Sequence, residues 1–127
     1  MLHMMFFILF PDLVCEQCII NLYEFIVDNM SSVDDVLDSV ISTGCLTSDE
    51  QQEIQLPTLT QRQQIRTLLQ YLQCKGQRGF KGLVAGLENS RKEEKRKKGN
   101  KFVAQRLKEE KKKIEEEGLS SISNRRG

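Results

Sequence analysis

The chain has 127 residues, of which 39% are hydrophobic and 29% are charged, and its formal net charge is +1. These values fit one globular domain with a single core, followed by a tail. The chain has a single histidine, no glycine-rich phosphate loop and no carboxylates clustered in an apolar setting, so we predict no catalytic residues and no enzymatic activity.

The near-neutral total hides a chain that is polarised from end to end. Residues 1–57 hold ten acidic residues and no Lys or Arg, residues 58–90 hold five basic residues and one acid, and residues 91–127 hold fourteen basic residues and seven acids. A molecule with such unlike regions can attract copies of itself.

Residues 1–11 are predicted to be an apolar N-terminal extension. The run "MLHMMFFILF" lacks a cationic region and a small-residue cleavage site, and Pro11 ends it short of a bilayer span, so a signal peptide or anchor is the less favoured reading. Whether the run packs on the domain or is a start-site artefact stays open.

Helices are predicted for residues 12–90, because apolar residues recur every three or four positions and no strand alternation competes. The first helix ends near Met30, and its apolar positions are Val14, Cys18, Ile19, Leu22, Phe25 and Ile26. Ser31–Ser32 offers an N-cap for the second helix, and Gly44 ends it. One stripe of that helix is apolar, comprising Val33, Val36, Leu37, Val40 and Ile41. The opposite, exposed side carries Asp34, Asp35 and Asp38.

A capping box, Thr47-x-x-Glu50, starts a short third helix on which Asp49, Glu50 and Glu53 are exposed and Ile54 is buried. The fourth helix starts at Thr58 or Thr60, ends at Gly76 and buries Ile65, Leu68, Leu69 and Leu72. Arg62 and Arg66 lie one turn apart on its flank. The fifth helix buries Phe80, Leu83, Val84 and Leu87, with Arg78 and Lys81 outside. Short connections make these helices a compact antiparallel bundle.

Residues 91–127 form a charged tail, helical or disordered, with too few apolar positions for a heptad seam. It is a solvated linker or helix, a binding segment for nucleic acid or an anionic membrane through "KRKK" and "KEEKKK", a nuclear address, or, through "KFVAQRL", a further packed helix. These alternatives stay open.

The four cysteines are predicted to be reduced and mostly buried in a cytoplasmic protein. Cys15, Cys18, Cys45 and Cys74 could form two disulfides, but each lies among apolar residues and nothing marks the chain as secreted. Zinc needs four ligands and His3 is the only histidine, so we predict no metal and no cofactor.

Residues 33–87 resemble a caspase recruitment domain (CARD) of the death-fold superfamily. The resemblance rests on "VDDVLDSVISTGCLTSDEQQEI", then "PT" at Pro57–Thr58, "RQQIRTLLQYL" from Arg62 and "KGQRGFKGLVAGLE", in the family's order and spacing. With the first helix it covers about residues 12–90 and implies an all-α, five- to six-helix Greek-key bundle. Two departures are the "SRKEEKRKKGN" that separates the fifth helix from any sixth, and a first helix without basic residues.

The resemblance implies a non-enzymatic adaptor or regulator that binds CARD-containing proteins of the caspase, adaptor or sensor type in apoptotic or innate immune signalling. An acidic surface from helices two and three would meet a basic surface from helices one and four of the next molecule. The acidic face would comprise Asp34, Asp35, Asp38, Asp49, Glu50 and Glu53. The basic face would comprise Arg62, Arg66, Lys75, Arg78 and Lys81.

Two unlike faces on one molecule make a heterologous contact, which grows into a filament when it does not close into a ring. The sequence leaves open the partner, the pathway, and whether the chain is an activator or a decoy inhibitor. The alternative from another class is a small helical protein whose basic tail binds nucleic acid or an anionic membrane surface.

Overall fold

The computed structural model describes residues 11–89 and 99–124, with side chains to residue 117. All regular secondary structure in the described residues is helical and they contain no strand, which confirms the predicted all-α fold. The helices are α2 (Pro11–Asn21), α3 (Tyr23–Asn29), α4 (Val33–Ser42), α5 (Ser48–Ile54), α6 (Gln61–Gln73), α7 (Gly76–Glu88) and α8 (Asn100–Asn124).

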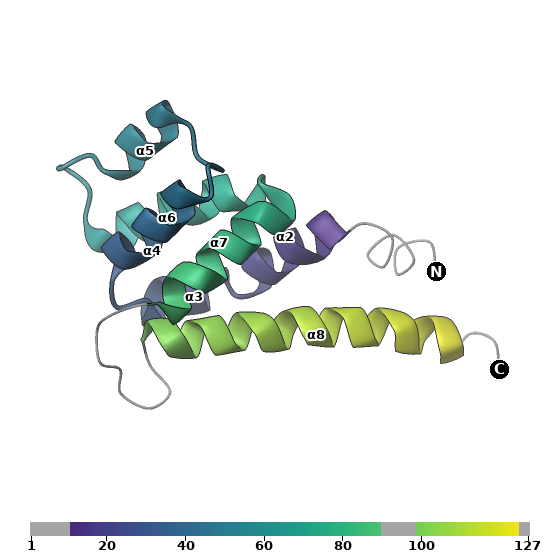
Figure 1. Ribbon diagram of the computed structural model, residues 1–127. Helices are drawn as coiled ribbons and strands as arrows, with labels where there is room; N and C mark the ends of the chain where they lie inside the picture. Colours follow the sequence, from purple (N-terminus) through teal and green to yellow (C-terminus); the bar gives the residue numbers. More distant parts are fainter. Residues whose placement is uncertain (1–10, 90–98, 125–127) are drawn as a thin grey trace.

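Helix α7 lies at the centre of the bundle, where it contacts α2, α4, α6 and α8. The long α8 runs along one side of the molecule, beside α2, α3 and α7 (Figure 1). The short α5 packs on α6 at the opposite side (Figure 1). The two surfaces carried by α5 and α8 therefore face away from each other.

Local hydrogen bonds set the starts of α5 and α6. Thr47 Oγ1 accepts from the Glu50 amide at 3.1 Å, and Glu50 Oε1 accepts from the Thr47 amide at 2.8 Å, which confirms the predicted capping box. Thr60 makes the same reciprocal pair with Gln63, so Thr60 rather than Thr58 caps α6.

Two glycines lie at helix boundaries: Gly44 follows the end of α4 as predicted, whereas Gly76, predicted to end α6, is the first residue of α7. Gly44 and Gly76 have φ of +73° and +62°, values in the left-handed region that favours glycine. The chain can therefore turn sharply after α4 and after α6, which gives the tight connections of the bundle.

The first helix differs from the prediction of one continuous element ending near Met30. The structure has two helices that join at Leu22, whose ψ of 12° lies outside the helical range. Leu22 still accepts from the Ile26 amide at 2.8 Å, so the break is local. It lets α2 pack on α6, α7 and α8, while α3 packs on α6 and α8.

The core follows the predicted apolar stripes with two corrections. Leu69 is 0% exposed, as are Ile65, Leu68, Leu72, Leu83 and Leu87. Phe25 and Ile41, which we expected inside, are only partly buried. Phe25 instead packs edge-on against Phe102 of α8, with 5.6 Å between ring centroids.

Helices α4 and α7 approach closely because glycines line the contact. A Cβ added at Gly86 would lie 2.8 Å from Val36 Cα, and one at Gly82 would lie 3.3 Å from Thr43 Cγ2. Any side chain at Gly86 would force the two helices apart.

The segment "KFVAQRL" lies in α8, and its apolar residues belong to the core. Val103 and Leu107 are 0% exposed and Ala104 is 1% exposed. Farther along, residues 112, 113 and 115–117 are exposed, although Ile114 still packs on the core. Helix α8 is thus a packed helix in its first part and a solvated one farther on. The "KRKK" run and the apolar residues 1–10 lie outside the described residues, and the limits drawn at 11 and 90 stay a prediction.

A side chain from α8 holds the start of α4. Ser32 is the N-cap residue, as predicted, but its hydroxyl makes no cap hydrogen bond. Asn100, 0% exposed, acts instead: its Oδ1 accepts from the Ser31 and Ser32 amides at 2.8 and 3.3 Å, and its Nδ2 donates to the Ser32 carbonyl at 3.0 Å.

The start of α7 is capped from a distance in the same way. Lys75, its N-cap residue, makes no side-chain cap hydrogen bond. Asp12 Oδ1, from the first turn of α2, accepts from the Gln77 amide at 2.9 Å. A carboxylate at a helix N-terminus is also favoured by the helix dipole, so this contact fixes α2 to α7.

Candidate functional site

Three carboxylates of the acidic face stand out from α4 and α5. Asp34, Asp38 and Asp49 are exposed, and none of them forms an ion pair with another described residue. Asp35 is half-buried. Glu53 is exposed and accepts a hydrogen bond from the Tyr71 hydroxyl, which raises the pKa of Tyr71 to about 12.

Glu50 differs from the prediction because its side chain is only 18% exposed. Lys75 Nζ donates to both of its carboxylate oxygens, at 3.0 and 3.1 Å. The hydrogen bond from the Thr47 amide, followed by this lysine, lowers the pKa of Glu50 below its ordinary value. Glu50 thus caps α5 and ties it to the start of α7, so one residue of the acidic face is bound to one residue of the basic face within the molecule.

The two arginines of α6 face acids of α3. Arg62 Nη2 lies 2.9 Å from Asp28 Oδ1. Arg66 pairs with both oxygens of Glu24, at 3.0 and 3.3 Å, and these hydrogen bonds raise the pKa of Arg66. Its guanidinium also lies 5.7 Å from the centroid of the Tyr23 ring.

Sequence reasoning missed Glu24 and Asp28 as neighbours of the basic face, although a signal was present. The two acids are one turn apart, as are Arg62 and Arg66, so antiparallel helices bring both pairs together. All four side chains are at least 38% exposed. Exposed ion pairs contribute about 0–1 kcal/mol, so these arginines can exchange their partners for the carboxylates of another molecule.

The remaining basic residues lie on α7. Arg78 and Lys81 are exposed, and neither forms an ion pair within the described part of the chain. Arg78 lies beside the turn after α4: a Cβ at Gly44 would be 3.6 Å from Arg78 Nη2. The five predicted basic residues therefore occupy two separate areas, one on α6 facing α3 and one on α7.

Some of the charges of α8 are paired with neighbouring side chains. Lys108 pairs with Glu88 of α7, Arg106 Nη1 lies 3.3 Å from Glu109, and Lys112 Nζ lies 4.0 Å from Glu116. Interleaved acids of this kind oppose the approach of a phosphate backbone. Binding of nucleic acid or a membrane by the tail stays a prediction.

The four cysteines are free thiols, three buried and one, Cys74, exposed. Burial raises the pKa of Cys15 and that of Cys18, the latter to about 12. Such thiols are poor thiolate ligands at neutral pH. Among the described residues no three His, Cys, Asp or Glu side chains could jointly hold a metal ion. None of the described helices combines the length and the apolar composition that crossing a bilayer requires.

The all-helical bundle of the described residues is consistent with the death-fold superfamily. The model of the caspase recruitment domain family matches residues 16–101, which is more than half of the chain, and the chain belongs to this family. No curated protein and no solved structure was found to match it. The matched span ends at the start of α8, at the residue after Asn100.

Caspase recruitment domains are protein-interaction domains without catalytic activity of their own, and they bind other domains of the same kind in apoptotic and inflammatory signalling. The functional residues of such a domain are therefore those on its surface that contact another protein.

Proposed function

We propose that the chain is a non-enzymatic adaptor or regulator that binds other CARD-containing proteins by CARD–CARD association, in the cytoplasm, in apoptotic or innate immune signalling. The observation that carries the proposal is the set of exposed carboxylates on α4 and α5, Asp34, Asp38 and Asp49, which lack an ion pair within the described residues. The free thiols agree with a reducing compartment.

The counterpart of this acidic surface is the arginine pair on α6. Arg62 and Arg66 lie one turn apart on α6 and form exposed, exchangeable ion pairs with α3. Their exchange to Asp34 and Asp38 of a neighbouring molecule keeps the number of ion pairs while it adds buried surface between the molecules. Charge complementarity then sets partner choice and encounter rate, and the surface buried between the molecules supplies most of the affinity.

The proposal is tested with two charge-reversed variants of the full chain, Asp34→Lys/Asp38→Lys and Arg62→Glu/Arg66→Glu. We expect each to lose self-association in sedimentation velocity, and a mixture of the two to regain it, because the reversed surfaces can meet each other. In the Arg62→Glu/Arg66→Glu variant the new carboxylates would repel Glu24 and Asp28 within the same molecule. Arg62→Gln/Arg66→Gln is the control, because it removes the positive charges without adding this repulsion. Far-UV circular dichroism checks the fold of all variants.

Capture of purified CARDs of the caspase, adaptor and sensor types extends the test to other partners. The parent chain should capture at least one of them, and the reversed variants should not. If both variants assemble and capture like the parent at low and at high salt, the charged faces are not the docking surfaces.

A further inference from the structure

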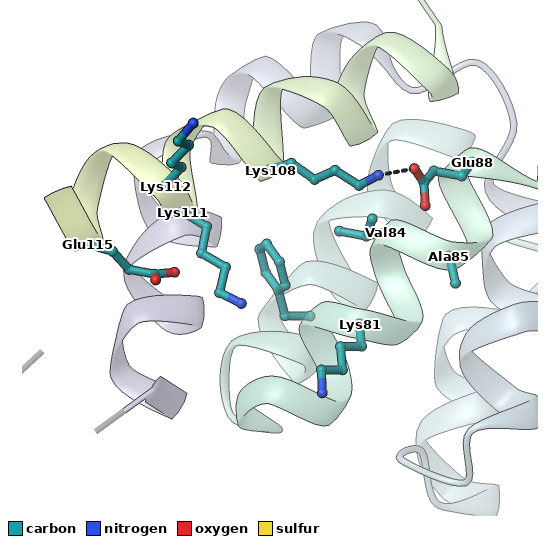
Figure 2. Close-up of a pocket in the computed structure, with 9 residues that line it drawn as sticks. Lys81, Val84, Ala85, Glu88, Lys108, Lys111, Lys112 and Glu115 are labelled. Atoms are coloured by element: carbon teal, nitrogen blue, oxygen red, sulfur yellow. Dashed lines mark hydrogen bonds and ion pairs between the residues drawn. The ribbon is translucent and has the colours of Figure 1, made fainter. Parts of the chain in front are cut away.

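A groove of about 450 Å³ runs between α7 and α8, away from the arginines of α6. Its floor is apolar, with Phe80, Val84 and Ala85 from α7. Charged side chains complete the lining, with Glu88 and Glu115 at opposite ends and the Lys112 side chain pointing away from the floor (Figure 2). They are Lys81, Lys108, Lys111, Lys112, Glu88 and Glu115.

The groove has more positive than negative charge. Lys108 reaches across to Glu88 (Figure 2), and Lys112 is 4.0 Å from Glu116. Lys81 has no ion pair within the described residues, and neither has Lys111. Two cations in a hollow thus remain available to an anionic ligand, and the hollow concentrates their field.

The ammonium group of Lys111 lies next to the apolar floor of the groove. Its Nζ lies 5.8 Å from the centroid of the Phe80 ring, so the ammonium group sits against the apolar floor rather than away from it. A ligand that fits presents an anionic group close to an apolar side chain.

The α5 side of the molecule presents this combination. Asp49 and Glu53 are exposed and one turn apart on α5, and Leu56 follows three residues later with 45% of its surface exposed. We call these three residues the α5 ridge. A leucine exposed to this extent, next to two carboxylates, matches a groove with an apolar floor and a cationic rim.

The ridge cannot reach the groove of its own molecule. Helices α5 and α8 lie on opposite sides of the bundle, with α6 and α7 between them (Figure 1). The apolar residues 1–10 of the same chain contain no acid, so they would leave the lysines of the groove unmatched.

We propose that the α7–α8 groove of one molecule receives the α5 ridge of a second copy of this chain, an inference that rests on the proposed homotypic association. Leu56 lies on the floor formed by Phe80, Val84 and Ala85. The carboxylates of Asp49 and Glu53 approach Lys81 and Lys111. The contact is heterologous and leaves the groove of the second copy free for a third.

The groove is small beside a stable protein–protein interface, which buries about 1,600 Å² in total. It therefore acts together with the proposed contact between α4 and α6 of neighbouring molecules. Two weak contacts between the same two molecules reinforce each other strongly, because closing the second is an intramolecular step.

The test uses the full chain and compares Lys111→Glu/Lys112→Glu with the matched control Lys101→Glu/Lys113→Glu. Both pairs lie on α8 and change the net charge equally, but only the first pair lines the groove. In sedimentation velocity we expect the groove variant to associate about tenfold more weakly than the parent and the control to stay within about twofold.

Two further variants examine the ridge. Leu56→Ala should weaken association about tenfold, through lost burial of the side chain. Asp49→Lys/Glu53→Lys should also weaken it, and mixing this variant with Lys111→Glu/Lys112→Glu should restore it. Equal association of parent, groove variant and Leu56→Ala would overturn the proposal, as would an equal loss in the control.

The outcome separates this proposal from the one on which it rests. If the groove and ridge variants weaken association while the Asp34/Asp38 and Arg62/Arg66 reversals do not, the groove contact stands and the α4–α6 face pairing fails. If the Asp34/Asp38 and Arg62/Arg66 reversals weaken association while the groove and ridge variants do not, the α4–α6 face pairing stands and the groove contact fails. Binding of inorganic polyphosphate that the groove variant loses, with self-association unchanged, would assign the groove to a free anion and overturn the proposal.

Discussion

Asn100→Ala tests directly whether α8 stabilises the bundle through the hydrogen bonds that Asn100 makes at the start of α4. The Asn100 side chain is fully buried and spans the junction between α3 and α4. Alanine removes the acceptor of the Ser31 and Ser32 amides and the donor to the Ser32 carbonyl, while Val103, Ala104 and Leu107 stay in place.

The size of the loss follows from these groups. Leaving a buried polar group without a partner costs about 1–3 kcal/mol, and Ser31 and Ser32 are half-buried, so water can reach part of them. Two orphaned amides and one carbonyl together give an expected loss of about 2–4 kcal/mol. For a domain of ordinary stability this is a large share of about 5–15 kcal/mol.

Urea unfolding followed by far-UV circular dichroism measures the effect. We expect the midpoint to fall by about 1–2 M, given a dependence of about 1–3 kcal/mol per M. Gln105→Ala, at an exposed position of α8, should change little. Ser32→Ala should also change the free energy of unfolding by less than about 0.5 kcal/mol, because the Ser32 hydroxyl is not a cap. A large loss in Ser32→Ala together with a small one in Asn100→Ala would refute the assignment of the cap to Asn100.

Four further predictions concern the core, the α4–α7 contact, a carboxylate and the thiols. Leu69→Ala, at a fully buried site, should lower the free energy of unfolding by about 2–5 kcal/mol, and an unchanged melting temperature would show that the packing of α6 is misassigned. Gly86→Ala should destabilise by about 1–3 kcal/mol, because its Cβ meets Val36 Cα at 2.8 Å, whereas Gly82→Ala, facing a side chain, should be clearly milder; equal effects would contradict this. Because the folded pKa of Glu50 is lowered, its contribution to stability is present above the unfolded pKa of about 4.3 and is lost as pH falls through the folded pKa. Glu50→Gln should therefore flatten the decline of unfolding free energy below about pH 5, and a slope equal to that of the parent would argue against it. Chelator and reductant should each leave helicity and melting unchanged; stoichiometric zinc in the purified protein would reopen a metal site.

The sequence predicted a helix boundary correctly where residues within one turn of that boundary determine it. The Thr47–Glu50 pair and the glycine at position 44 each act within one turn of the chain, so their residue types predict their structure. The periodic apolar positions of α4, α6 and α7 predicted the core for the same reason.

The errors arise where a distant segment takes over a local role. Asn100 caps α4 from 68 residues away, and Asp12 caps α7 from 65 residues away, so no pattern around either helix start indicated them. Phe25 was misplaced because its partner is Phe102, on a helix whose packing the sequence left open.

The sequence predicted which residues of the candidate interaction surfaces are charged, but it did not predict the ion pairs that they form within the molecule. The sequence shows that Arg62 and Arg66 share a flank, but whether a carboxylate stands opposite depends on the direction and spacing of α3. Glu50 was assigned to an exposed face because Lys75 lies 25 residues further on and meets it only in the folded bundle.

The packing partners of α2 and α3 also determine the order in which the chain can fold during translation. Both helices pack chiefly on α6, α7 and α8, so they have little to bury against until at least residue 61 has been made. At about 5–20 residues per second, the ribosome leaves the apolar side of the N-terminal helices uncovered for seconds. The bundle can close completely only after α8, which holds the start of α4, has emerged.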